Sequence, residues 1–306
     1  AYFDILLAQD DIESLEAEQR AISTELRRAE RALEVGSGTV TAVNEARARF
    51  DLVEARRLRA DNTLEIAREN LRRVIGREPG TLAGLRPGFE AEPPLPVDPG
   101  AWGERAERDN LQVRAARNSL LAAQEDLRIE EFERLPSVDL VAGLNRISRD
   151  TTGAGTSQRN VGQISLRLSM PLFTGGALES RIRQRQAERD ASSDDVRDAR
   201  RVAGLEAESA YRNLVAIDRQ IGALEQALRS IISTEESTRR GLEVGLRTTL
   251  DLLNAQRDRF ETERELAASR YAYLLEYLRL QVAVGGGLDQ ASVDDVNFFL
   301  DSDDQS

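Results

Sequence analysis

The sequence repeats itself with an offset of 209 positions, and this duplication constrains the possible folds more than any other feature. The matched positions are Ala1 and Ala210, Tyr2 and Tyr211, Ile12 and Ile221, Leu15 and Leu224, Leu33–Gly36 and Leu242–Gly245, Thr39 and Thr248, and Gly76 and Gly285. The offset is too long for a solenoid, whose repeats have about 20–45 residues. We therefore expect a duplicated unit made of several elements. The counterpart of the roughly 110 residues before Ala210 would precede Ala1, so the chain is expected to lack about its first quarter.

Apolar residues recur in alternating steps of three and four in both copies, which is the spacing of coiled-coil helices. The first stripe consists of Ile5, Ala8, Ile12, Leu15, Gln19, Ile22, Leu26, Ala29 and Leu33, and the second of Leu214, Ile217, Ile221, Leu224, Leu228 and Ile231. Each stripe ends near a glycine, Gly36 or Gly245, and a threonine follows at Thr39 or Thr248. Glycine suits the left-handed conformation after a helix, and threonine suits the cap of the next helix. The pattern predicts two helical hairpins, with returning helices over about 40–75 and 249–284.

Changes in composition divide the chain into six expected segments. They are a helical hairpin at 1–75, a Pro- and Gly-rich connector at 76–103, a helix at 104–136, a β-hairpin at 137–173, long helices at 174–285 and a final acidic segment at 286–306. Six prolines between Pro79 and Pro99 interrupt the helical pattern in the connector. The expected fold class is therefore mainly α, with long antiparallel coiled-coil helices and a small β-hairpin.

The charged residues exclude several classes of chemistry. The chain has 42 basic and 54 acidic residues, a net charge of −12, no His and no Cys, and all of its basic residues are Arg because Lys is absent. It therefore offers no imidazole base, thiolate, Schiff-base amine or ordinary zinc site. The net negative charge also disfavours nucleic-acid binding, which needs a clustered cationic surface. No window approaches the ~18 consecutive apolar residues of a membrane-spanning helix, and the start lacks the basic region of a signal peptide.

Residues 137–173 alternate with period two instead. One face of the second half carries Ile164, Leu166, Leu168, Met170 and Leu172. Val138–Leu144 alternates likewise, although Val141 interrupts its polar face, and a polar loop at 149–159 joins the halves. Two such strands fit a membrane β-hairpin, because a tilted strand crosses with about 9–11 residues. A half-buried soluble hairpin fits the pattern equally well. A hairpin in lipid would need further copies to pair its edges in a closed barrel.

Six motifs in this order and spacing resemble the TolC-type outer-membrane efflux protein family: Ala1–Phe3, Glu34–Gly36, Leu135–Leu140, Met170–Gly176, Val244–Ala255 and Arg270–Leu275. The resemblance implies a homotrimer whose strands form an outer-membrane pore surrounded by lipid, and whose helices form an α-barrel tunnel in the periplasm of a Gram-negative bacterium. It implies coupling to a periplasmic adaptor and an inner-membrane pump, for multidrug efflux or type I secretion. No catalysis, cofactor, metal or nucleic acid is implied. The missing quarter corresponds to the family's first helix and first β-hairpin.

The family closes its tunnel at the hairpin tips with polar links and rings of acidic residues. By position, Thr41 and Arg247 match one linked pair of the family. Asp251 matches the first position of the acidic rings, and Asn254 matches the second. Three copies of Asp251 around one axis would attract cations and repel each other. Because Asn254 carries no charge, we expect a weaker cation preference than two acidic ring positions would give. Arg247 and Asp251 could instead pair on an exposed helix, for only about 0.2–0.5 kcal/mol.

Two further sets of positions follow from the resemblance. A second polar link of the family is absent, because the apolar residues Leu242 and Ala42 occupy its two positions. The turns Val35-Gly36 and Val244-Gly245-Leu246 match the grooves that receive adaptor hairpins, although they could be mere helix ends.

Two other classes of function remain as alternatives. A soluble coiled-coil protein that binds partners would account for the heptads and the charge, but not for the alternation at 161–173 or the duplication. An enzyme with paired carboxylates would need two acidic side chains converging in one pocket. Most acidic residues here lie opposite the apolar stripes, which is typical of a solvated helix face.

Overall fold

The computed structural model describes residues 1–86, 88–89, 91, 93–151, 155–286 and 299–300. In these residues the elements are α1 (Tyr2–Glu34), α2 (Val40–Ile75), α3 (Pro99–Asp109), α4 (Leu111–Phe132), β1 (Ser137–Thr151), β2 (Gly155–Ser169), α5 (Ala177–Glu243) and α6 (Thr249–Ala283). They group into one compact unit of residues 1–106 and 204–306 and another of residues 107–203. The expected fold class, mainly α with a small antiparallel β-hairpin, is confirmed.

The turn between α1 and α2 forms for the reasons that the sequence indicates. Gly36 has a φ of 75°, in the left-handed region that favours glycine. Thr39 is extended, with a φ of −119° and a ψ of 148°, and its side chain caps α2 by accepting a hydrogen bond from the backbone of Ala42. Gly245 has the same φ of 75° between α5 and α6. Local sequence therefore determines both reversals of the chain.

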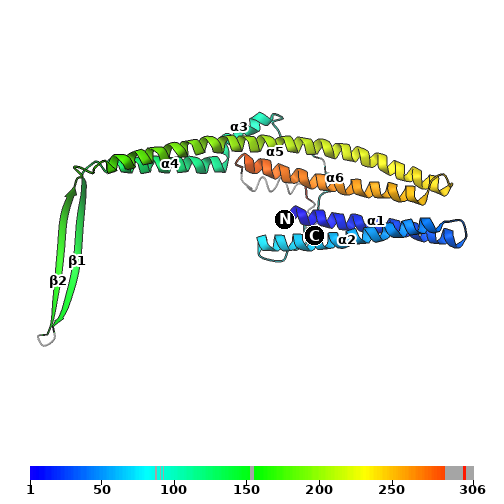
Figure 1. Ribbon diagram of the computed structural model, residues 1–306, viewed down its shortest axis with the longest axis horizontal. Helices are drawn as coiled ribbons and strands as arrows, with labels where there is room; N and C mark the ends of the chain where they lie inside the picture. Colours follow the sequence, from blue (N-terminus) through cyan, green and yellow to red (C-terminus); the bar gives the residue numbers. More distant parts are fainter. Residues whose placement is uncertain (87, 90, 92, 152–154, 287–298, 301–306) are drawn as a thin grey trace, which may run out of the picture. The chain divides into compact units, whose positions relative to one another are not determined.

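The first unit is held together by the apolar stripes of its helices. Figure 1 shows α1 lying between α2 and α6, and both helices contact it. Leu15 and Ile22 of α1 pack with Val53 of α2 and Leu253 of α6 in one buried cluster. Burying one such side chain contributes about 1.5–3 kcal/mol to folding. The two helical hairpins of this unit therefore share a core, and both of their turns lie at the same end (Figure 1).

The helix that sequence analysis places at 104–136 begins earlier and is divided. It begins at Pro99, since proline suits the first position of a helix, which lacks a hydrogen-bond acceptor for its N–H. Asn110 then separates α3 from α4, and its side-chain oxygen accepts a hydrogen bond from the backbone of Gln112 at 2.7 Å. In the first unit, Trp102 stacks on Tyr211 with ring centroids 6.0 Å apart. This stacking anchors the start of α3 to α5.

The β-hairpin of the second unit has two strands of 15 residues each. Its register pairs Val138 with Leu168, Leu140 with Leu166, and Ala142 with Ile164, so apolar side chains share one face. The ladder continues through most of the segment expected as a loop at 149–159, because backbone pairing does not depend on apolar side chains. The expected Met170 and Leu172 lie beyond the last residue of β2. None of the helices in the described ranges is long and apolar enough to cross a bilayer.

Candidate functional site

The two turns of the first unit expose the residues that sequence analysis assigns to adaptor docking. Val35, Val244 and Leu246 have exposed fractions of 77%, 69% and 82%, and Gly36 and Gly245 form the bends beside them. The turns lie close enough to share a cavity of about 300 Å³, which is lined by both helical hairpins. The structure thus brings these five residues to one end of the unit.

Asp251 forms a capping box with Thr248 at the start of α6. Its carboxylate accepts a hydrogen bond from the backbone N–H of Thr248 at 2.9 Å, and its own N–H donates to the Thr248 hydroxyl at 3.1 Å. The backbone hydrogen bond from Thr248, followed by its side chain and the nearby Arg247, holds the pKa of Asp251 below its usual range. Sequence analysis missed this role, although an acidic residue three positions after a capping threonine is a known signal. The pairing fixes the direction of the carboxylate.

The expected link between Thr41 and Arg247 is not formed in the residues that the structure describes. Both residues are exposed, and no hydrogen bond joins them there. The side chain of Arg247 instead lies over Gly241, where an added Cβ would be 2.7 Å from its Cγ. A link between Thr41 and Arg247 thus remains a prediction.

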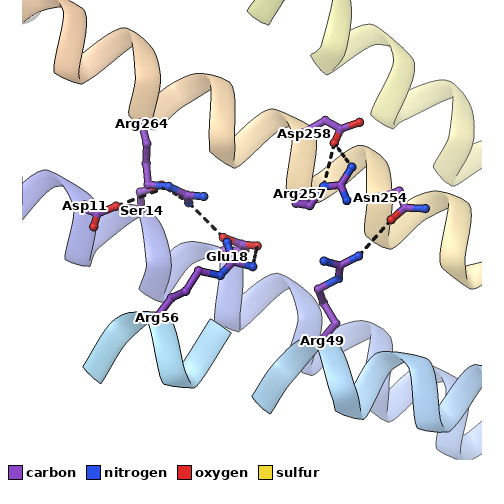
Figure 2. Close-up of polar contacts among 9 residues, drawn as sticks. All are labelled: Asp11, Ser14, Glu18, Arg49, Arg56, Asn254, Arg257, Asp258 and Arg264. Atoms are coloured by element: carbon purple, nitrogen blue, oxygen red, sulfur yellow. Dashed lines mark hydrogen bonds and ion pairs between the residues drawn. The ribbon is translucent and has the colours of Figure 1, made fainter. Parts of the chain in front are cut away.

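Asn254 contacts the other helical hairpin. Arg49 of α2 donates a hydrogen bond from Nη2 to Asn254 Oδ1 at 3.1 Å, as Figure 2 shows. A second contact joins the helical hairpins nearer the turns, where Arg28 of α1 lies 3.8 Å from Glu243 of α5. Sequence analysis did not predict either contact.

A buried carboxylate joins three helices further from the turns. Glu18 of α1 is fully buried, with an exposed fraction of 0%. Arg264 of α6 donates to it at 3.1 Å, and Arg56 of α2 lies 3.6 Å from its other oxygen (Figure 2). Arg264 also lies 3.5 Å from Asp11 and 3.4 Å from the Ser14 hydroxyl. A buried charge is costly unless it is paired, so this arrangement holds α1, α2 and α6 in one relative position.

Acidic residues line a cleft between α1 and α6. The cleft has a volume of about 300 Å³, and Asp10, Asp11 and Glu263 lie along it. Burial raises the pKa of each of these three carboxyls. Among the described residues, no group of three or more acidic side chains is placed to hold a metal ion.

The β-hairpin exposes its apolar face. Ile164, Leu166 and Leu168 have exposed fractions of 81%, 72% and 69%, and their cross-strand partners Val138 and Leu140 are exposed as well. Exposed apolar side chains in a continuous row mark a surface that contacts lipid or another protein. The predicted membrane-facing residues of β2 thus lie on one exposed face.

The chain is similar to proteins of the outer membrane. A family model described as outer membrane efflux protein matches residues 1–77 and 102–286. Outer membrane protein TolC of Vibrio cholerae is 33% identical over 300 residues, which cover 97% of this chain and 68% of that protein. The alkaline protease secretion protein AprF of Pseudomonas aeruginosa is 28% identical over 296 residues, covering 96% of this chain and 61% of that protein.

A solved structure confirms the fold. The crystal structure of CusC matches with a TM-score of 0.77 at 21% identity, over 94% of this chain and 66% of that one. The chain thus spans from 61% to 68% of the length of these three proteins.

Proposed function

Because the chain belongs to the outer membrane efflux protein family, we propose that three copies form the exit channel of an efflux or type I secretion system in the outer membrane of a Gram-negative bacterium. The names of the relatives, an outer membrane protein and a protease secretion protein, support this function. They also agree with the expectation that the chain is a passive duct and not an enzyme.

The exposed apolar face of the β-hairpin carries the proposal. Leu140, Leu166 and Ile164 present a lipid-compatible surface, while Asp139 and Arg167 stand opposite each other on the other face. Such alternation suits a barrel wall with lipid on one side and water on the other. A two-stranded sheet has two unpaired edges, and unpaired backbone groups cost several kcal/mol each in hydrocarbon. Pairing with strands of further copies removes this cost, which supports a closed oligomer.

The helical hairpins would form the periplasmic tunnel, and most of the chain would lie in that compartment. Their turns are the proposed docking surface for a periplasmic adaptor, which would connect the channel to an inner-membrane pump. Val35, Val244 and Leu246 support this assignment, because they are apolar and exposed beside glycine turns. Exposed apolar side chains beside glycines, which have no side chain, can contact a helical turn of a partner protein.

The narrow end of the tunnel is proposed to be the tip of the helical hairpins. Asp251 would form a ring of three carboxylates, and its hydrogen bonds to Thr248 keep the carboxylate ordered and ionised. Asn254 would contribute no charge, so the ring would select cations less strongly than a double acidic ring. Thr41 and Arg247 would complete the closure if the tips rearrange on assembly.

Membrane insertion tests the proposed function directly. The protein would be extracted from the outer-membrane fraction in detergent, sized for a trimer, and added to planar lipid bilayers. We expect a trimer that produces discrete conductance steps. A monomer that stays in the soluble fraction would instead support the alternative, a soluble coiled-coil protein. The exposed leucines of the β-hairpin argue against that alternative, because they would be left in water.

A further inference from the structure

The apolar face of the β-hairpin ends in a polar pair of residues. Four cross-strand pairs supply the apolar part of this face: Val138 with Leu168, Leu140 with Leu166, Ala142 with Ile164, and Leu144 with Gly162. The next pair on the same face is Arg146 with Asn160, because successive pairs alternate between the two faces. Both of these side chains are exposed. The helices α4 and α5 adjoin the start of β1 and the end of β2, so the polar pair lies in the half of the β-hairpin farther from them (Figure 1).

The position of Arg146 along β1 suits the boundary of a bilayer. Arg146 comes eight residues after Val138, which is about 27 Å along a strand at about 3.4 Å per residue. A tilt of about 40° reduces this length to about 21 Å across the bilayer, close to the ~25 Å height of the lipid-facing band of a barrel. At the other end, Leu172 and Phe173 follow β2, are 89% and 91% exposed, and add apolar surface. With the helices in the periplasm, Arg146 would lie where the hydrocarbon of the outer leaflet meets its head groups.

The charge of this end of the β-hairpin favours an anionic partner. Residues 144–163 contain three Arg and one Asp, a net charge of +2, whereas the whole chain has a net charge of −12. A phosphate group suits Arg146 in particular, because a planar guanidinium donates two parallel hydrogen bonds to phosphate oxygens. The amide of Asn160 can supply a further donor. Leu144 precedes Arg146 on the same face and is 95% exposed, so a phosphate at Arg146 would have apolar surface directly beside it.

We propose that Arg146 and Asn160 bind the phosphate group of an acylated glycolipid in the outer leaflet, with the acyl chains of the same molecule against Leu144 and the apolar row below it. This inference rests on the proposed channel function and names the lipid that would surround the outer rim of the channel. A free phosphate ion would leave Leu144 in water, whereas a lipid covers it, and this difference favours the lipid. A trimer carries three such sites, one on each β-hairpin. The bound lipid would hold the channel at one depth in the membrane.

Lipid binding to the detergent-solubilised protein tests the site. Diphosphoryl lipid A is titrated against the trimer, and native mass spectrometry counts the bound molecules. We expect R146Q to bind about tenfold more weakly than the wild type, as for the loss of a charge-assisted hydrogen bond. R159Q is the matched control, because Arg159 belongs to the adjacent cross-strand pair, with Ile147, and lies on the opposite face. It makes the same charge change and should bind as the wild type.

Two results with these variants would overturn the proposal. Unchanged binding in R146Q would remove Arg146 from the site. An equal loss in R159Q would show that lipid A responds only to the overall charge of this end of the β-hairpin.

Two further probes identify the chemistry of the ligand. Lipid A without its phosphates should bind the wild type about tenfold more weakly than diphosphoryl lipid A. Inorganic phosphate at the concentration of the lipid should not displace it, because the ion makes no apolar contact. Equal affinity for the two lipids, or displacement by inorganic phosphate, would overturn the assignment to a phosphorylated lipid. If R146Q forms no trimer, the comparison of the two lipids on the wild type decides the question.

Bilayer recordings separate this inference from the proposed function. Wild-type protein that forms no conducting trimer would contradict the channel, and the inference with it. A wild type that conducts but binds both forms of lipid A equally would leave the channel in place and overturn only the lipid site.

Discussion

Tyr271 of α6 donates a hydrogen bond of 2.7 Å from its hydroxyl to Asp10 of α1, and so joins the two helical hairpins in the halves of these helices that lie farther from the turns. Burial raises the pKa of Asp10, and the bond from Tyr271 counteracts part of that effect. Burial thus disfavours the ionised form of Asp10, and the hydrogen bond from Tyr271 stabilises that form.

The first prediction concerns this pair. Y271F is expected to destabilise the protein by about 1–2 kcal/mol at neutral pH, because a half-buried carboxylate loses its donor. The raised pKa of Asp10 means that its ionised form opposes folding, so stability is gained as the pH falls through the folded pKa. The cost of Y271F should therefore shrink on acidification. Denaturant unfolding of both proteins across this range measures the difference. In a D10N background the difference should not vary with pH, and a cost of Y271F that still shrinks there on acidification would contradict the explanation.

The second prediction concerns the buried carboxylate. E18A should cost about 3 kcal/mol, the low end for breaking a buried pair, since Arg56 and Arg264 retain some contact with water. E16A is the matched control, because Glu16 lies in the same helix and pairs with Arg20 at 3.7 Å, with side chains 46% and 70% exposed. Its expected cost is below about 0.5 kcal/mol. Similar unfolding midpoints for the two variants would refute the importance of Glu18.

The third prediction concerns the acidic ring. D251N should abolish most of the cation preference of the channel, while D258N should preserve it, because Asp258 pairs with Arg257 at 2.6 Å on the same helix. Reversal potentials in a salt gradient measure the preference. Equal selectivity of D251N and the wild type would place Asp251 outside the conducting path.

The fourth prediction follows from the low pKa of Asp251. Its hydrogen bonds to Thr248 keep the carboxylate ionised below the usual range of aspartate, so the cation preference should persist into mildly acidic solution and disappear only below that range. T248A removes the hydroxyl and should shift the loss of selectivity to higher pH. It should also weaken the start of α6 by about 1 kcal/mol, as expected for a lost helix cap. An unchanged pH profile in T248A would show that the capping box does not tune this carboxyl.

The fifth prediction concerns the β-hairpin. L166R should impair insertion into the outer membrane, because an arginine on the lipid face is costly, by up to about 2–4 kcal/mol at mid-membrane and less near the interface. S165R, one residue away on the opposite face, is the control and should insert normally. The yield of trimer in the outer-membrane fraction measures both. Equal yields would show that this face does not meet lipid.

Local signals in the sequence were sufficient to predict the helical hairpins and which residues share a face of the β-hairpin. Gly36 and Thr39 act within one turn of chain, and the alternation around Leu166 follows from the geometry of a strand. The strand ends could not be predicted, because the polar residues near 149–159 pair through their backbone. The break between α3 and α4 at Asn110 was not predicted either, because a capping residue does not interrupt the apolar spacing of a helix.

The polar contacts between helices could not be predicted from the sequence. Arg49 and Asn254 are 205 positions apart, and their contact depends on how α2 and α6 are rotated about their axes. Arginine and acidic residues occur on every helix, so many pairings were equally plausible. Glu18 gave no signal either, because its counterpart in the second copy is Ala227.

The register of the β-hairpin limits how this part of the chain can vary. Removing one residue of β2 between Gly155 and Ile164 would turn the remaining side chains of that strand to the opposite surface, with Arg159 taking the orientation of an apolar neighbour. A length change of two residues would therefore keep each side chain on its face, whereas an odd change would need a β-bulge to restore the register.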